Sequence, residues 1–174
     1  KGVAIAPDLE DAEAHVHAMM VDRRFGQAGA HIVIEELLLG REASFFVLCD
    51  GTRALPLGSA EDHKRALDGD KGPNTGGMGA YSPAPIATTE VLSIVERDVF
   101  VPIVDALRSD DAPFRGLLYA GLMITPGGPK VLEFNCRFGD PETQPILMRL
   151  RSDLTELVDA ALDGRLHQVD VDWD

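Results

Sequence analysis

The sequence predicts an α+β fold, a mostly antiparallel sheet with helices packed on one side. Two turn signals carry this prediction. Asp50-Gly51 separates the apolar runs 43–49 and 53–58, and an Asp-Gly pair between such runs is typical of a β-hairpin. Pro126-Gly127-Gly128 separates a second pair of apolar runs in the same way. Neighbouring strands joined this tightly pair antiparallel, which argues against a doubly wound parallel sheet.

The expected strands are runs rich in β-branched and aromatic residues. After the first hairpin, the stretch 59–85 shows no apolar periodicity and is rich in Gly, Pro, Asp and Asn. It is too long to be an idle connection in a compact domain, so we expect it to be either disordered or functional. The expected strands span 31–38, 43–49, 53–58, 116–125 and 130–136.

Three helices are expected where apolar residues recur at helical spacing. Asp8 is the expected N-cap of the first helix and Ser152 that of the last, because short polar side chains accept hydrogen bonds from free backbone amides. Pro102 should kink or restart the second helix. The expected helices span 8–21, 88–107 and 153–162.

Composition excludes several classes of protein. A formal net charge of −13 argues against broad contact with nucleic acid, whose phosphates require clustered Lys and Arg. No apolar run is long enough to span a membrane. The two cysteines, Cys49 and Cys136, suggest no disulfide framework. Each lies in an apolar run and is expected to be buried, which favours a reducing, cytoplasmic setting.

One strand carries the clearest chemical pattern. Because side chains alternate between the faces of a strand, Glu133, Asn135 and Arg137 share one face. Phe134 and Cys136 share the other face and are expected in the core. A carboxylate, an amide carbonyl and a guanidinium in a row suit a Mg²⁺ ion held against nucleotide phosphates, with the arginine as a phosphate clamp. A solvated strand face with a Glu–Arg pair is the alternative.

A Gly-rich loop at 72–83 is the second candidate. Glycines let the backbone approach a ligand and present amides to an anion, and Asn74 and Thr75 add hydrogen-bonding side chains. The loop is neither a Walker loop, since no Gly-Lys-Ser/Thr follows, nor a Rossmann loop, since no apolar strand leads into it. The upstream segment Asp62-His63-Lys64-Arg65 supplies the cations that a negatively charged substrate needs.

Two weaker candidates flank the expected strands. Glu35-Glu36 and Glu42, on either side of a short linker, could bind an adenine edge and ribose hydroxyls, or could be solvated acids. Asp140 and Glu142 follow the Glu133 strand in a segment that is either functional or an ordinary Gly/Asp/Pro turn.

Together these residues resemble the glycinamide ribonucleotide synthetase family of the ATP-grasp superfamily. The resemblance covers 1–166, with the motifs in the same order and at similar spacing. The Gly-rich loop and the segment 133–144 are specific to that family, whereas the Glu36 region is shared by ATP-grasp proteins at large. The segments that carry the resemblance are 34–40, 62–65, 73–83, 119–123 and 133–144.

The resemblance implies an ATP-dependent ligase of de novo purine biosynthesis. In that reaction glycine is activated as glycyl phosphate, and the amine of 5-phosphoribosylamine then displaces phosphate. The products are glycinamide ribonucleotide, ADP and phosphate. The implied partners are ATP with Mg²⁺ or Mn²⁺, glycine and phosphoribosylamine, with no nucleic acid and no membrane.

The resemblance also implies a role for each candidate residue. Glu133 and Asn135 hold the metal, and Arg137 and Lys64 are the catalytic residues, with Arg137 steadying the phosphoryl group. A symmetric two-carboxylate metal site is not expected, because the strand 117–124 is wholly apolar. The residues expected to bind the nucleotide are Glu35, Glu36, Leu37, Leu38 and Glu42. The residues expected to bind the substrates are Asp62, Lys64, Asn74, Thr75, Gly76, Gly77, Met78, Gly79 and Asp140.

Finally, the resemblance implies a division of the chain. We expect 1–38 to be the remainder of an incomplete small ATP-grasp lobe, 39–166 the large lobe, and 167–174 the start of a linker. The chain begins without Met, and the family's flanking domains and phosphate-covering glycine loop lie outside it, so we expect the chain alone to be a very poor ligase. Two alternatives stay open: another ATP-grasp carboxylate–amine ligase, and a non-catalytic nucleotide-binding module.

Overall fold

The computed structural model describes residues 2–69 and 71–174, with Asn74 described by its backbone alone. The chain divides into two compact units, Lys1–Leu38 and Leu39–Asp174, and each is described by itself. No helix in the described ranges is both long and apolar enough to cross a membrane.

The first unit is built from one α-helix and two irregular helical turns. α1 (Leu9–Val16) begins after Asp8, whose carboxylate accepts a hydrogen bond from the Asp11 amide at 3.0 Å, so the predicted cap is confirmed. The helix continues into a π-helical turn, η1 (His17–Val21), and a 3₁₀ turn, η2 (Gly26–Gly29), follows.

The strand predicted at 31–38 is wrong. Residues 32–39 form no regular element, and the side chains of Val33 and Ile34 are exposed. A β-branched run becomes a strand only where a neighbouring strand completes its hydrogen bonds. No segment of residues 2–69 and 71–174 pairs with this run.

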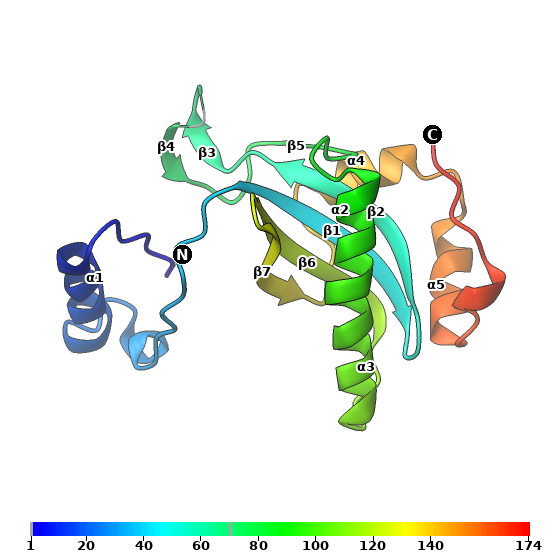
Figure 1. Cartoon of the computed structure of the whole chain (residues 1–174), viewed down its shortest axis with the longest axis horizontal. Coiled ribbons are helices and arrows are strands. Elements are labelled where there is room, and N and C mark those ends of the chain that lie inside the picture. The colour runs from blue at the N-terminus through cyan, green and yellow to red at the C-terminus, as the bar shows by residue number, and fades with distance from the viewer. Residues whose placement is uncertain (1, 70) are drawn as a thin grey trace. The chain divides into compact units, whose positions relative to one another are not determined.

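The second unit contains a five-stranded antiparallel sheet and a separate two-stranded sheet. The strands are β1 (Arg41–Asp50), β2 (Ala54–Asp62), β3 (Arg65–Leu67), β4 (Lys71–Asn74), β5 (Ala80–Tyr81), β6 (Arg115–Thr125) and β7 (Gly128–Asn135). The larger sheet has the order β5-β2-β1-β6-β7, and β3 pairs with β4 (Figure 1). Both predicted hairpins, β1–β2 and β6–β7, are confirmed. The stretch 59–85 is ordered by the short strands β3 to β5, which its composition does not predict.

Five helical elements accompany the sheet. They are α2 (Thr89–Val95), the π-helical turn η3 (Glu96–Phe100), α3 (Val101–Ser109), α4 (Thr143–Arg149) and α5 (Leu154–Leu162), and the 3₁₀ turn η4 (Leu166–Gln168) follows them. The predicted second helix is α2, η3 and α3 in succession, and α3 restarts beside Pro102 as predicted. Asp153 caps α5, accepting from the Thr155 amide at 2.7 Å, so the predicted Ser152 cap is wrong. The sequence predicts no helix at α4, because a proline such as Pro145 usually ends a helix. Pro145 lies in the first turn of α4, where proline is tolerated.

The sheet separates two hydrophobic clusters. Phe45 and Val47 of β1 enter the cluster that packs against α2 and α3, and Phe46 and Leu48 enter the cluster that packs against α4 and α5. Helices therefore cover both faces (Figure 1), and the prediction of helices on one side is wrong. Trp173, near the end of the chain, packs against the second cluster. That 167–174 begins a linker stays a prediction.

Candidate active site

One face of the sheet brings two of the predicted site residues, Glu133 and Asn135, onto the same side. Backbone pairing aligns Ser44 of β1 with Gly121 of β6, and Gly121 in turn with Glu133 of β7. Tyr119 lies opposite Asn135 in the same way. Paired residues point to the same side of a sheet. These five residues therefore share the face that packs against α4 and α5, which we call the site face.

An irregularity in β7 aims Glu133 onto the site face. Gly121 lies opposite Glu133, but the next residue, Leu122, lies opposite Val131, so Leu132 is an extra residue in the ladder. An extra residue of this kind redirects the side chains around it. Leu122 belongs to the opposite cluster, and without the shift Glu133 would follow Val131 to that side.

Glu133 and Asn135 could supply oxygen donors for a cation. Glu133 is exposed and Asn135 is half-buried, so both are accessible at this edge of the sheet. Carboxylate and amide oxygens are ligands that Mg²⁺ accepts, usually one or two from the protein with the rest from water and phosphate. The donor set therefore fits such an ion. In residues 2–69 and 71–174, no three His, Cys, Asp or Glu side chains gather as a metal site.

The expected burial of Phe134 and Cys136 is wrong. Phe134 is 38% exposed and Cys136 is exposed, because β7 is an edge strand that the helices cover only in part. Cys49, in the middle strand β1, is fully buried as predicted. Burial, with a contribution from the charge of Asp50, raises the pKa of the Cys49 thiol to about 12, so it behaves as a small hydrophobic group.

Lys64 forms an ion pair with Glu42, two residues that the sequence assigned to different ligands. Both side chains are partly shielded, 27% and 36% exposed. Burial alone would lower the pKa of Lys64, but the hydrogen bond and charge of Glu42, with Tyr119 and Asp62, outweigh burial and raise it. Lys64 is therefore a fixed cation next to the site face.

The Gly-rich loop folds back onto the segment that carries Lys64. The His63 carbonyl accepts from the Met78 amide at 2.7 Å, and the His63 amide donates to the Gly79 carbonyl at 2.9 Å. The Lys64 carbonyl accepts from the amide of Thr75 at 2.7 Å and from its hydroxyl at 2.9 Å. Backbone bonds thus hold the loop and Lys64 together. The side chain of Asn74 lies outside what the structure describes, and its role stays a prediction.

Gly77 brings the loop against the segment that follows β7. Its φ is +128°, and a Cβ there would lie 2.5 Å from Pro141 Cδ and 3.0 Å from Asp62 Oδ1. No side chain fits in this position. Gly76, by contrast, is exposed and has no neighbour within 4 Å of a built Cβ.

Arg137 and Asp140 lie on the exposed part of the same segment. The Arg137 guanidinium donates to the Phe138 carbonyl at 2.9 Å, and Asp140 accepts from the Gln144 amide at 3.1 Å. In the described residues, the Arg137 guanidinium thus bonds to its own segment and forms no pair with Glu133, and the side chains of Arg137 and Asp140 are exposed to solvent.

Sequence reasoning did not single out Ser44 and Tyr119. In the structure, Ser44 Oγ lies 3.1 Å from both Tyr119 Oη and Glu142 Oε1, and all three residues are buried. The available signal was a hydroxyl group within each of two central hydrophobic runs, from Ser44 in one and from Tyr119 in the other.

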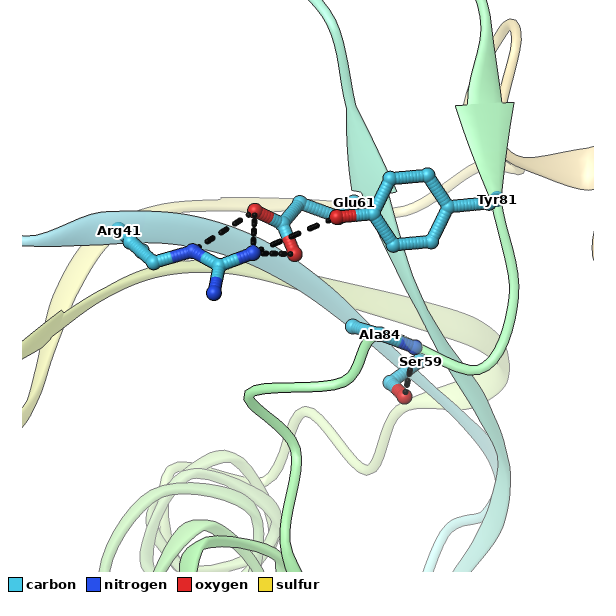
Figure 2. A network of polar contacts seen from close by, with 5 residues as sticks. All are labelled: Arg41, Ser59, Glu61, Tyr81 and Ala84. Carbon is cyan, nitrogen blue, oxygen red and sulfur yellow. Dashed lines mark hydrogen bonds and ion pairs between the residues drawn. The ribbon is translucent and has the colours of Figure 1, made fainter.

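Figure 2 shows a second polar network. It lies on the opposite face of the sheet, because Glu61 alternates along β2 with Ala60, which is paired with Ser44 of the site face. Arg41 binds both carboxylate oxygens of Glu61, at 2.7 and 2.8 Å, and reaches the Tyr81 hydroxyl at 3.4 Å. The hydrogen bond with Glu61 raises the pKa of the Tyr81 phenol. Nearby, Ser59 Oγ accepts from the Ala84 amide at 3.3 Å. These contacts fasten the downstream end of the Gly-rich loop to β2.

The expected nucleotide-binding residues are divided between the units. Glu35, Glu36 and Leu37 are exposed and Leu38 is half-buried in the first unit, whereas Glu42 belongs to the second. Their joint role stays a prediction.

The fold defines the class of protein. Biotin carboxylase from Campylobacter jejuni, solved as a β,γ-ATP complex, matches 94% of this chain and 34% of its own with a TM-score of 0.69 at 12% identity, a likeness of fold alone. The chain has the ATP-grasp fold, as predicted.

More narrowly, the chain belongs to the family described as phosphoribosylglycinamide synthetase, ATP-grasp (A) domain, whose model matches residues 1–143. Phosphoribosylamine–glycine ligases from Allochromatium vinosum and Ralstonia nicotianae are 62% and 53% identical to the whole chain. The solved phosphoribosylamine–glycine ligase from Thermotoga maritima matches 75% of this chain and 33% of its own, with a TM-score of 0.65 at 35% identity. The chain spans 41% and 42% of the length of the first two relatives.

Proposed function

We propose that the complete protein carrying this chain is an ATP-dependent phosphoribosylamine–glycine ligase that works in the cytoplasm. Its reaction joins glycine to 5-phosphoribosylamine through glycyl phosphate, and releases ADP and phosphate. The relatives that match the whole chain carry this name, and family membership covers most of its length.

One observation carries the proposal: three segments that are distant in sequence meet around the site face. Lys64 contacts Glu42, the Gly-rich loop is bonded to the Lys64 backbone, and Gly77 rests on Pro141 beyond the Glu133 strand. A ligase that handles a nucleotide, an amino acid and a phosphorylated amine needs such a junction, because their reacting atoms must be brought together.

In the first step a glycine carboxylate oxygen attacks the γ-phosphorus of ATP, and the bond to the β–γ bridging oxygen breaks. Catalysis of this transfer depends on positioning and charge neutralisation. Lys64 is held as a cation by Glu42, and the exposed Arg137 clamps the transferring group. Glu133 and Asn135 would hold Mg²⁺ or Mn²⁺, which when bound neutralises charge on the phosphates.

In the second step the amine nitrogen of phosphoribosylamine attacks the glycyl carbonyl carbon. The carbon–oxygen bond to phosphate breaks, phosphate leaves, and the nitrogen loses a proton to water. We assign the binding of the sugar phosphate and glycine to the Gly-rich loop with Asp62 and Asp140. The loop is suited to this role because its backbone is already ordered, so little entropy is lost when the anion binds.

We assign the adenine pocket to Glu35, Glu36, Leu37 and Leu38, and the ribose contact to Glu42. The ion pair of Glu42 with Lys64, both in the second unit, would join the ribose contact to the transferring phosphate.

The proposal is tested by the complete protein and its Glu133→Gln variant. Continuous ADP formation over many turnovers should require glycine and phosphoribosylamine together, because the amine must consume glycyl phosphate before the next turnover. Glu133→Gln should lower kcat at least about 100-fold, the loss typical of one electrostatic contact to a transition state. An exposed carboxylate on α2, Glu90, gives the matched control Glu90→Gln, which should keep full activity. ADP formation that needs a different carboxylic acid or amine would favour another ATP-grasp ligase. No ADP formation at all would favour a nucleotide-binding module.

A further inference from the structure

Ser44, Tyr119 and Glu142 form a buried polar network to which the reaction above gives no role. The three residues are 4%, 5% and 5% exposed and come from β1, β6 and the residue before α4. Ser44 Oγ lies 3.1 Å from Tyr119 Oη and 3.1 Å from Glu142 Oε1. Burying a carboxylate costs free energy unless its oxygens accept hydrogen bonds or pair with a cation, so the buried position of Glu142 calls for a reason.

The chemistry of the three groups gives the network a direction. A carboxylate only accepts hydrogen bonds, and a serine hydroxyl has one proton to donate. The Ser44 proton therefore goes to Glu142, and Tyr119 donates its own proton to Ser44 Oγ. A directed chain of this kind fixes all three side chains at once.

Glu142 does not serve the helix that it precedes. It stands at the N-cap of α4, yet its side chain makes no capping hydrogen bond and turns back toward the sheet. The carboxylate presses against Gly139, where any Cβ would collide with Glu142 Oε2. Thr143 closes the same turn through its amide, which donates to the Gly139 carbonyl at 3.1 Å. The turn 139–142 is thus folded around this carboxylate.

The network lies next to two parts of the proposed site, the Gly-rich loop and Glu133 of β7. Pro141, next to Glu142, is the residue on which Gly77 and the Gly-rich loop rest. On its other side, a Cβ at Gly121 would meet Tyr119 Oη at 3.1 Å and Glu133 Cγ at 3.4 Å, so the Tyr119 hydroxyl and Glu133 are neighbours. Moving Glu142 would displace the loop relative to the Glu133 strand.

We propose that Ser44 is a positioning residue: by holding Glu142 in the core, it sets the turn 139–142 and the Gly-rich loop at a fixed distance from Glu133. The inference rests on the proposed function. Neither Ser44 nor Glu142 needs to touch a substrate, since both act through the segments that do.

The test compares four variants of the complete protein by steady-state kinetics in each substrate. Ser44→Ala and Glu142→Ala should each lower kcat/KM for phosphoribosylamine about 10-fold or more, since small displacements of reacting groups are costly, while KM for ATP stays unchanged. Glu142→Gln keeps the shape and an oxygen for the Ser44 proton, so it should stay within about threefold of wild type. Val47→Ala is the control, a truncation in the same strand on the opposite face that loses packing only.

Three results would overturn the positioning role. In the first, Ser44→Ala behaves as Val47→Ala does once thermal melts have shown both to be folded. In the second, Glu142→Gln lowers kcat/KM for phosphoribosylamine as much as Glu142→Ala does, which would mean that activity depends on the negative charge of Glu142 and not on its hydrogen bond with Ser44. In the third, KM for ATP rises as much as that for phosphoribosylamine. A wild-type protein that forms no ADP from these substrates overturns the proposed function instead, so the two failures are distinguishable.

Discussion

Gly77 packs directly against Pro141, so closely that a methyl group on Gly77 would stand 2.5 Å from the proline Cδ. This contact joins the Gly-rich loop to the turn beyond β7, two segments that the sequence shows only as separate motifs. It also requires a backbone φ of +128° that residues with a side chain rarely adopt. The relative placement of the two segments therefore depends on a residue with no side chain.

Gly77→Ala should displace the loop from the turn. We expect kcat/KM for phosphoribosylamine to fall at least about 10-fold, because the added methyl group must move either Pro141 or the loop. Gly127→Ala is the control, an exposed glycine in the β6–β7 turn where the new methyl group would meet only Thr125 Oγ1, at an ordinary contact distance of 3.7 Å. Equal activity of the two variants would show that the Gly77 contact does not position the substrate site.

Glu133→Gln and Asn135→Ala should each weaken metal-dependent nucleotide binding. The expected loss in affinity for Mg²⁺–ATP is about 10-fold per variant, since Glu133→Gln removes the negative charge of one donor and Asn135→Ala removes the oxygen of the other. Calorimetry on the complete protein, with and without Mg²⁺, measures the effect. Without metal, the variants and the wild type should bind ATP equally, and a loss that persists there would point to a fault in folding.

Glu42→Gln should lower the pKa of Lys64. In the wild type, burial favours the neutral amine but the hydrogen bond and charge of Glu42 help to outweigh burial, so removing the charge leaves burial opposed mainly by the weaker contributions of Tyr119 and Asp62. The alkaline limb of the pH profile of kcat/KM should therefore move to lower pH in the variant. Direct titration of the Lys64 amine by NMR gives an independent measurement, and an unchanged titration would show that the pair is not formed in solution.

The same ion pair sets a pH limit on stability. A raised pKa means that the contribution of Lys64 to stability is fully present below its ordinary pKa of 10.5 and is lost as the pH rises through the higher folded value. The difference in Tm between the wild type and Glu42→Gln should therefore be the same at neutral pH as at pH 9. The difference should disappear only under strongly alkaline conditions.

Asp50→Asn should loosen the β1–β2 hairpin. Burial alone would raise the pKa of Asp50, but hydrogen bonds from the Thr52 and Arg53 amides, the Thr52 hydroxyl and the Leu166 amide lower it. Removing the charge should cost about 2 kcal/mol, which corresponds to about 30-fold faster hydrogen exchange at the hairpin amides. Asp105→Asn, at an exposed helix pair, should change local exchange little.

The acid dependence of the Asp50 contribution has a definite sign. A lowered pKa gives stability that is present above the ordinary value of 3.8 and lost as the pH falls through the lower folded value. The difference in exchange between the wild type and Asp50→Asn should therefore shrink below pH 3.8. A difference that grows on acidification would contradict the assigned hydrogen bonds.

The parts of this structure that depend on local chemistry could be predicted from the sequence. The Asp50-Gly51 hairpin, the Asp8 cap and the common face of Glu133 and Asn135 all follow from turn, capping and alternation rules. What could not be predicted depends on partners distant in the chain. The run 31–38 has strand composition but no neighbouring strand among the described residues. Phe134 is apolar but lies on an edge strand.

The site was predictable in its groups but not in its connections. The sequence shows Lys64 and Glu42 as separate candidates, and only the pairing of strands brings them into an ion pair. The extra residue Leu132, which turns Glu133 toward Tyr119, leaves no mark in the pattern of residues. Ser44 looks like an ordinary small residue in a buried strand until Glu142 is seen beside it.

The two tyrosines of this chain, Tyr81 and Tyr119, lie in the two polar networks on opposite faces of the sheet. The Tyr81 phenol reports on the end of the Gly-rich loop, and the Tyr119 phenol reports on the hydrogen bonds that lead through Ser44 to Glu142. Fluorotyrosine incorporated at these two positions would give a pair of ¹⁹F resonances that follow the two faces separately during turnover. Each label would replace one ring hydrogen of a tyrosine that is already present, so no residue of either network has to be exchanged for another type.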